Sequence, residues 1–444
     1  MTFAGRVAGV LGTRLIQLGS TIAVSFLLAR YLGPDGRGVY AVLILLPTTL
    51  FAIGQLGLTS AMVFRAGRGG SLGDLERHTV GLGLGVSAVV VGATLLALPL
   101  LEKTVLKVAP DDLLRLALVA LPLRLVATLA GSVLYGRQLF RAYNAILAIQ
   151  SVLGVVLVVA LVGVLAAGVP GALAAYLLFL AFGTVVVLAY LDRLRRATAE
   201  NRDRVSAGDL LGYGLRLYPA SVGTFFGYRA DVFLLGWLLG SPTEIGIYAV
   251  AVSLAELVFN VPDAVSTVLF PRIASADRAE ADVLAPAMAR ATVLVTALAA
   301  LALVPAAWLA LSLLLPAFIG GLTALLVILP GIVGLSLAKV LTSYLSGIDR
   351  LAPVTGAAVV SLVVNLVANL ALIPAWGIVG AAAASLVSYT IYAVLMVGFA
   401  SQASGAPWHA FVVPRAEDAS RLGAAFGRLI GSLPGPRRSA GRGA

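Results

Sequence analysis

Ionisable and amide side chains lie inside apolar runs of this sequence that are long enough to cross a bilayer. An ionised side chain at the bilayer centre costs roughly 2.5 to 3.5 kcal/mol, so such groups must face protein or water. Arginine forms paired hydrogen bonds with phosphate oxygens, and the cations therefore predict an anionic ligand. The candidate binding residues are Arg14, Arg124, Arg216, Arg229, Lys339, Asn365 and Asn369, and the candidate coupling residues are Asp231 and Glu256.

Arg229 is the first choice among these residues because of its expected depth. It lies about 15 Å along the helix from the nearer end of its apolar run, too far to reach the headgroups easily. Tyr218 and Phe225 fall on the same helical face. Aromatic rings beside a guanidinium suit a sugar pyrophosphate. Residues two apart point away from each other, so Asp231 is a poor partner, and Arg229 binds either substrate phosphate or Glu256.

The other cations have a simpler alternative. Arg14, Arg216 and Lys339 lie about one to two turns from the predicted cytoplasmic side, where a long side chain can extend to the headgroups. Arg124 lies within the fourth apolar run. We expect all four to contact substrate where their helices line an aqueous path, and headgroup contact is the alternative for the first three.

The amides and carboxylic acids also allow two interpretations. Asn365 and Asn369 share one face of the eleventh run, where side chains bind substrate or form interhelical hydrogen bonds. Asp231 and Glu256 could titrate near neutral pH in a dry lumen and couple transport to protons. The sequence contains no feature that decides between these roles.

The elements that must position these side chains are membrane helices. Hydrophobic residues make up 60% of the chain and charged residues 11%, and the mean hydropathy is +1.02. No soluble core needs this much apolar surface. Runs of about 20 residues, each able to cross a bilayer of about 30 Å, predict an all-α polytopic membrane protein with about twelve transmembrane helices. The runs are 10–31, 39–64, 78–100, 113–133, 144–167, 171–190, 212–239, 246–270, 286–313, 318–345, 353–373 and 377–400.

Charge in the connecting segments predicts the topology. Alternate loops are rich in arginine, and the positive-inside rule places them in the cytoplasm together with both termini. The other loops hold little beyond Arg37, Lys103 and Lys107 and are predicted to lie outside. This distribution explains the net charge of +11 without a nucleic-acid partner. We expect a multi-pass protein of the cytoplasmic (inner) membrane. The arginines that set the orientation are Arg65, Arg68, Arg77, Arg137, Arg141, Arg193, Arg195, Arg196, Arg202, Arg204, Arg272, Arg278 and Arg350.

Several kinds of chemistry are excluded by what the sequence lacks. There is no cysteine, and the two histidines, His78 and His409, are far apart. Disulfides, thiol catalysis and Cys/His metal sites are therefore excluded, and no nucleotide-binding loop or hydrolase motif occurs. We expect no cofactor, no metal and no enzymatic activity.

One motif occurs twice, at the first break in each half of the chain. "LGPDGRGVYAV" spans residues 32–42, and "LGSPTEIGIYAV" spans residues 239–250. Gly33 and Gly240 suit a tight turn, and Tyr40 and Tyr248 are expected at the membrane interface. Six runs per half predict two six-helix lobes related by a parallel repeat. The expected divisions are an N-terminal lobe (1–190), a cytoplasmic basic linker (191–211), a C-terminal lobe (212–400) and a cytoplasmic basic tail (401–444).

Taken together, these segments resemble a known family. The order and spacing of "LLARYLGPDGRGVYAV", "GQLGLTSAMVFR", "RADVFLLGWLLGSPTEIGIYAV", "VLFPRIA" and "NLVANLALIPAWGIVGAAAASLVS" are similar to those of the polysaccharide-biosynthesis flippases in the MATE-like MOP exporter superfamily. The resemblance implies two lobes around a V-shaped cavity. It also implies export of a polyprenyl-pyrophosphate-linked oligosaccharide, in the company of polysaccharide polymerase and glycosyltransferase partners.

Two other transport functions and one enzymatic function stay open. A cation-coupled multidrug exporter of the same fold would need acidic groups for cationic drugs, whereas the membrane-embedded charge here is mostly arginine. A peptidoglycan-precursor lipid flippase typically has two further helices, for which this chain offers no room. A membrane polymerase or glycosyltransferase would need catalytic acids on a sizeable outer loop, and the outer loops are short.

Overall fold

The computed structural model describes residues 3–198, 203–260 and 277–415, together with positions 262, 263, 265, 266, 269 and 273; side chains are described except those of residues 3–12, 14, 217 and 219–229. All elements within these residues are helical. Nine of the described helices are long and apolar enough to cross a membrane. The predicted class of all-α, multi-pass membrane protein is therefore confirmed.

The N-terminal half contains seven α-helices. The first, α1, extends over 52 residues and is interrupted at Gly33, whose φ of 66° is not helical. Helix α6 continues as a π-helix, η1. The elements are α1 (Phe3–Gly54), α2 (Leu58–Gly67), α3 (Leu72–Lys103), α4 (Asp111–Ala117), α5 (Ala120–Gly136), α6 (Phe140–Val158), η1 (Val159–Val164) and α7 (Gly168–Ala197).

The C-terminal half also contains a long interrupted helix and a helix that continues as a π-helix. Its last long helix, α13, extends over 54 residues with a non-helical Gly377 (φ 55°) inside, and α11 continues as a π-helix, η3. The elements are α8 (Ala207–Leu238), α9 (Pro242–Glu256), η2 (Leu257–Phe259), α11 (Arg278–Leu309), η3 (Ala310–Leu314), η4 (Pro316–Phe318), α12 (Gly321–Gly347), α13 (Leu351–Ser404) and α14 (His409–Val412).

The interruptions at Gly33 and Gly377 explain the lengths of α1 and α13. A straight helix of 54 residues would be about 80 Å long, far more than a bilayer of about 30 Å. Gly33 lies between the predicted spans 10–31 and 39–64, and Gly377 is the first residue of the span 377–400. Helix α13 therefore contains two predicted spans, and α1 contains one and most of a second. Helix α8 also covers a predicted span but is not among the nine candidates. The count of twelve stays a prediction.

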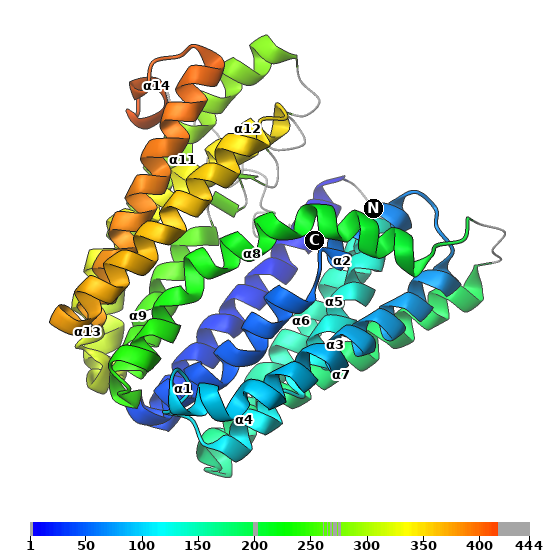
Figure 1. The fold of residues 1–444 in the computed structure, drawn as a ribbon, viewed down its shortest axis with the longest axis horizontal. Helices are drawn as coiled ribbons and strands as arrows, with labels where there is room; N and C mark the ends of the chain where they lie inside the picture. The colour runs from blue at the N-terminus through cyan, green and yellow to red at the C-terminus, as the bar shows by residue number, and fades with distance from the viewer. Residues whose placement is uncertain are drawn as a thin grey trace, which may run out of the picture. The chain divides into compact units, whose positions relative to one another are not determined.

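The chain forms two compact units. Unit 1 consists of Met1–Leu254, Ala306–Val327 and Leu362–Ser385, and unit 2 of Ala255–Pro305, Ile328–Ser361 and Leu386–Ala444. In unit 1, α3, α5 and α7 lie side by side (Figure 1), and leucines such as Leu75, Leu129 and Leu191 are fully buried among them. The predicted lobe boundaries stay predictions.

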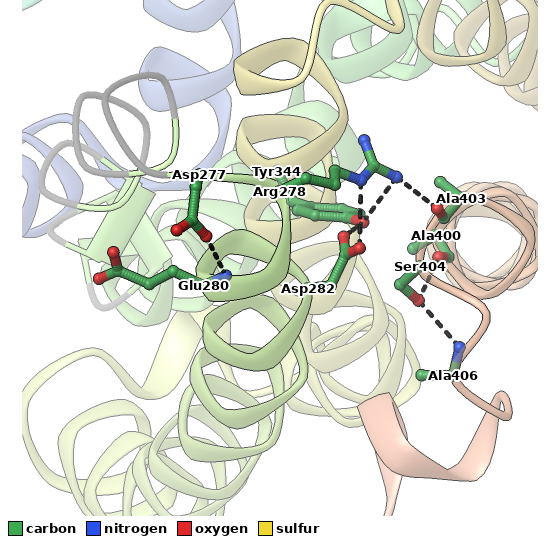
Figure 2. Close-up of polar contacts among 9 residues, drawn as sticks. All are labelled: Asp277, Arg278, Glu280, Asp282, Tyr344, Ala400, Ala403, Ser404 and Ala406. Atoms are coloured by element: carbon green, nitrogen blue, oxygen red, sulfur yellow. Dashed lines mark hydrogen bonds and ion pairs between the residues drawn. The ribbon is translucent and has the colours of Figure 1, made fainter.

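A polar cluster in unit 2 joins the start of α11 to α12 and to the end of α13 (Figure 2). Arg278 pairs with Asp282 at 3.1 Å and donates a hydrogen bond to the Ala403 carbonyl. The Tyr344 hydroxyl, from α12, donates to Asp282. These contacts hold three helices together at the end of unit 2 that the charge pattern assigns to the cytoplasm.

Candidate functional site

The two copies of the repeated motif contact each other in unit 1. A Cβ atom added to Gly38 of α1 would collide with the Pro242 carbonyl of α9, and one added to Gly246 would collide with the Pro34 carbonyl. The two helices therefore approach backbone to backbone, which only glycine allows at these positions. Because 242 − 34 and 246 − 38 both equal 208, the contact is the same when viewed from either copy of the repeat.

Polar contacts connect the same two halves of the chain nearby. The Thr243 hydroxyl donates a hydrogen bond to Asp35, again 208 positions away. Two cations of the N-terminal half bind carbonyls at helix ends of the C-terminal half, where the helix dipole favours positive charge. Lys107 donates to Trp237 O at 3.0 Å, and Arg30 to Leu314 O at 3.1 Å.

We call this set of contacts the outer seam, because the charge pattern assigns its loops to the outside. It consists of the Gly38–Gly246 helix contact and the hydrogen-bonded pairs Asp35–Thr243, Lys107–Trp237 and Arg30–Leu314. An apolar cluster formed by α1, α9 and η3, with Ala29, Val250 and Leu311 buried in it, adds to these contacts. The outer seam joins the two halves of the chain within unit 1.

The start of α8 packs on the N-terminal half at the opposite, predicted cytoplasmic, end of unit 1. The Tyr213 ring stacks on Phe64 of α2 with centroids 4.6 Å apart. Val205 N donates to Asp74 Oδ2 at 3.1 Å. Tyr218 donates its hydroxyl proton to Ile53 O at 2.6 Å, so this side chain of the predicted aromatic face is bound to α1.

Among the candidate cations whose side chains the structure describes, Arg124 of α5 has the surroundings that suit an anion best. Its side chain is half-buried, its Nη1 donates to Thr48 Oγ1 of α1 at 3.1 Å, and its guanidinium lies 4.7 Å from the centre of the Phe51 ring. Among the described residues it has no acidic partner. A guanidinium has five N–H donors, and only one hydrogen bond of Arg124 is formed within the described residues.

The remaining cations fall into three situations. Lys339 of α12 pairs with Asp263 at 2.6 Å and lies 4.6 Å from the centre of the Phe259 ring. Arg216 of α8 is exposed. The side chains of Arg14 and Arg229 lie outside the described residues.

The amides and acids are more enclosed than the cations. Asn365 and Asn369 of α13 are 1% and 0% exposed, and Asn369 Nδ2 donates to Asn365 Oδ1 at 3.0 Å. Asp231 of α8 is 5% exposed and accepts a hydrogen bond from the Tyr248 hydroxyl. Glu256, the last residue of α9, is partly buried. Tyr248 itself is 0% exposed, because its hydroxyl donates to the buried Asp231; its position at the level of the membrane interface stays a prediction.

Sequence reasoning missed the partners of Arg124. Thr48 and Phe51 lie 76 and 73 positions before it, inside an apolar run. The available signal was Pro47-Thr48-Thr49, a short polar interruption of that run. The i, i+4 pairing of the two asparagines, by contrast, follows directly from helical periodicity.

Comparison with solved structures identifies the fold. A structure titled lipid II flippase MurJ in an inward closed conformation aligns with a TM-score of 0.70 at 14% identity, covering 96% of this chain and 91% of that one. Inward-facing and outward-facing structures of a multidrug resistance MATE family transporter of the MOP superfamily align with TM-scores of 0.64 and 0.60, each at 16% identity. They cover 88% and 90% of this chain and 95% and 96% of theirs. At these identities the likeness concerns the fold alone.

Comparison at the level of sequence families is more specific. No curated protein matches the chain. A family profile described as polysaccharide biosynthesis protein matches residues 27–321, which include both copies of the repeated motif. The match extends over more than half of the 444 residues. This multi-pass membrane protein therefore belongs to the polysaccharide biosynthesis protein family.

Proposed function

We propose that this protein is a flippase that moves a polyprenyl-pyrophosphate-linked oligosaccharide across the cytoplasmic membrane for cell-surface polysaccharide synthesis. Family membership supports the pathway, and the fold is one that transporters use. The observation that carries the substrate class is Arg124: a half-buried, membrane-embedded guanidinium with no acidic partner among the described residues. A pyrophosphate would supply the missing negative charge through paired hydrogen bonds.

The outer seam supports a mechanism of alternating access. With the seam closed, the two halves of the chain are joined at the predicted outer end, and substrate would enter from the cytoplasm. Opening requires the Asp35–Thr243 hydrogen bond and the contact of Gly38 with Gly246 to separate. Their positions in the repeat let the two halves part along equivalent surfaces, as in other repeat-built transporters.

The remaining candidates keep secondary roles in this proposal. Arg14, Arg216, Arg229 and Lys339 are proposed to guide the pyrophosphate, and Asn365 and Asn369 to bind sugar in another state, since both are buried here. Asp231 and Glu256 are the candidates for coupling transport to an ion gradient. Both termini are proposed to be cytoplasmic, and a polymerase and glycosyltransferases are the proposed partners.

Reconstitution tests the substrate class. In proteoliposomes, Arg124→Ala is expected to reduce flipping of a polyprenyl-pyrophosphate sugar by about tenfold to a hundredfold, because one charge-assisted contact is lost. Arg124→Lys should keep part of the activity as a point charge without the fork. The matched control is Arg115→Ala, which removes an exposed arginine of α4. Equal loss in the control, or no loss in Arg124→Ala, would contradict the assignment.

A second candidate is a flippase for a peptidoglycan-precursor lipid, favoured by the likeness to the lipid II flippase. The two substrates share a polyprenyl pyrophosphate and differ in the attached group. The same proteoliposomes should therefore be tested with lipid II and with cationic dyes. If the protein prefers lipid II, the proposed substrate changes from the oligosaccharide to lipid II. If it moves only the dyes, the function of a multidrug exporter replaces the whole proposal.

A further inference from the structure

Arg37 is a buried cation that the proposed transport path does not use. It follows the interruption of α1, and its side chain is 8% exposed. Its Nε atom is buried and has no hydrogen-bond partner among the described residues. The ring of Tyr40 lies 5.7 Å from its guanidinium carbon. The protein itself covers this charge, so Arg37 does not simply extend into water.

The surroundings of Arg37 add positive potential. The helix restarts after Gly33, which places Arg37 in the first turn of the second segment. A methyl group at Gly36 would lie 3.4 Å from Val169 Cγ2, so the start of α7 is adjacent. The N-terminal ends of helices carry partial positive charge. Two such ends and a guanidinium therefore meet at one place.

No described acid balances this charge. Asp35 is two positions away, on a different face of the helix, and it accepts the hydrogen bond of Thr243. Tyr40 is the only titratable side chain in electrostatic contact with Arg37 among the described residues. Tyr176 of α7 interacts with Tyr40 in turn. These tyrosines supply O–H donors and no negative charge.

We propose that Arg37, with Tyr40 and Tyr176, forms a phosphate-binding site at the outer end of the N-terminal half. A buried charge without an acidic partner is costly, and a guanidinium presents a planar fork of N–H donors that matches two phosphate oxygens. The charge pattern places this site at the level of the outer headgroups. The phosphate can therefore come from a phospholipid headgroup or from the solution. The inference goes beyond the proposed transport, because binding requires no flipping.

Binding is tested with the purified full-length protein in nanodiscs made of a phosphate-free galactolipid. Inorganic phosphate is titrated in one arm, and phosphatidylglycerol replaces galactolipid stepwise in the other. Both arms measure the thermal unfolding midpoint. We expect a saturable rise in the wild type, confined to the phosphatidylglycerol arm if the source is lipid and present in both arms if it is free phosphate. No rise in either arm overturns the proposal.

Variants locate the site. Arg37→Gln should abolish the response, and Arg37→Lys should weaken the apparent affinity by about tenfold because the fork is lost. Lys103→Gln, which removes an exposed cation also predicted to lie outside, should behave like the wild type. If Arg37→Gln does not fold, the thermal unfolding responses of Arg37→Lys and Tyr40→Phe decide whether this site binds phosphate. Wild-type affinity in the Arg37 variants contradicts the assignment.

Discussion

Arg124 and Lys339 show how surroundings decide what a membrane-embedded cation can do. Lys339 has Asp263 at 2.6 Å, so its charge is already balanced. Arg124 has a neutral threonine and an aromatic ring. An anionic substrate gains most from the cation that no carboxylate neutralises, because binding there separates no existing ion pair. Of these two described cations, Arg124 is therefore the stronger candidate contact, and the role of Arg229 stays a prediction.

Removing each cation should distinguish these cases. Lys339→Ala is expected to destabilise the protein by only about 0.5 to 1 kcal/mol, since the Asp263 side chain is 61% exposed. The double variant Lys339→Ala, Asp263→Ala should recover most of this loss. Thermal unfolding of the purified proteins measures both effects. Arg124→Ala should reduce flipping more than Lys339→Ala does, and the reverse order would move the phosphate contact to Lys339.

At this scale the sequence indicated residue types better than partners. Arg124 was identifiable because a charge inside an apolar run is costly. Its contacts with Thr48 and Phe51 arise from the packing of α5 on α1, which a local pattern does not encode. The hydrogen bond of Tyr248 with Asp231, 17 positions earlier, could not be predicted for the same reason.

At the scale of elements, the close contact of α1 with α9 depends on two glycines. Any side chain at Gly38 or Gly246 meets a backbone carbonyl, which cannot rotate away as a side chain can. The helices must then separate or shift. Crowding of this kind typically costs about 1 to 3 kcal/mol.

Gly38→Ala should therefore lower the unfolding midpoint and weaken the outer seam. The matched control is Gly92→Ala in α3, where an added Cβ meets nothing within 4 Å. Gly92→Ala should be neutral or slightly stabilising, because alanine favours helix. Thermal unfolding of both variants checks this expectation. Equal midpoints for the two variants would mean that the α1–α9 contact contributes nothing to stability.

The apolar runs predicted where the helices lie, but they did not predict every break within a run. The second predicted span, 39–64, is continuous in sequence, yet α1 ends at Gly54 and α2 begins at Leu58. Between them Leu56 and Gly57 adopt positive φ values of 46° and 69°. Gly57 lies against the backbone of Gly214 in α8, 157 positions later (214 − 57). This turn is set by a distant contact and leaves little trace in the local sequence.

At the scale of the whole molecule, the internal repeat explains why the motif occurs twice. The spacing of the motif predicted the repeat from the sequence alone. The structure adds that Gly38 lies against Pro242 and Gly246, and that Gly246 lies against Pro34 and Gly38. Two equivalent surfaces that meet at one end can separate there without rebuilding either half. The sequence could not give this contact, since nothing in the spacing requires the two copies to be neighbours.

A reversible crosslink across the outer seam tests the central claim most directly. The chain has no native cysteine, so Asp35→Cys with Thr243→Cys creates a single possible disulfide between side chains now in contact. In proteoliposomes, flipping of a polyprenyl-pyrophosphate oligosaccharide is measured before and after oxidation, and again after reduction. We predict transport in the reduced protein, none in the oxidised protein and recovery on re-reduction. Unchanged flipping with the disulfide formed would contradict the gating role of the seam, and no flipping by the reduced and wild-type proteins would contradict the function itself.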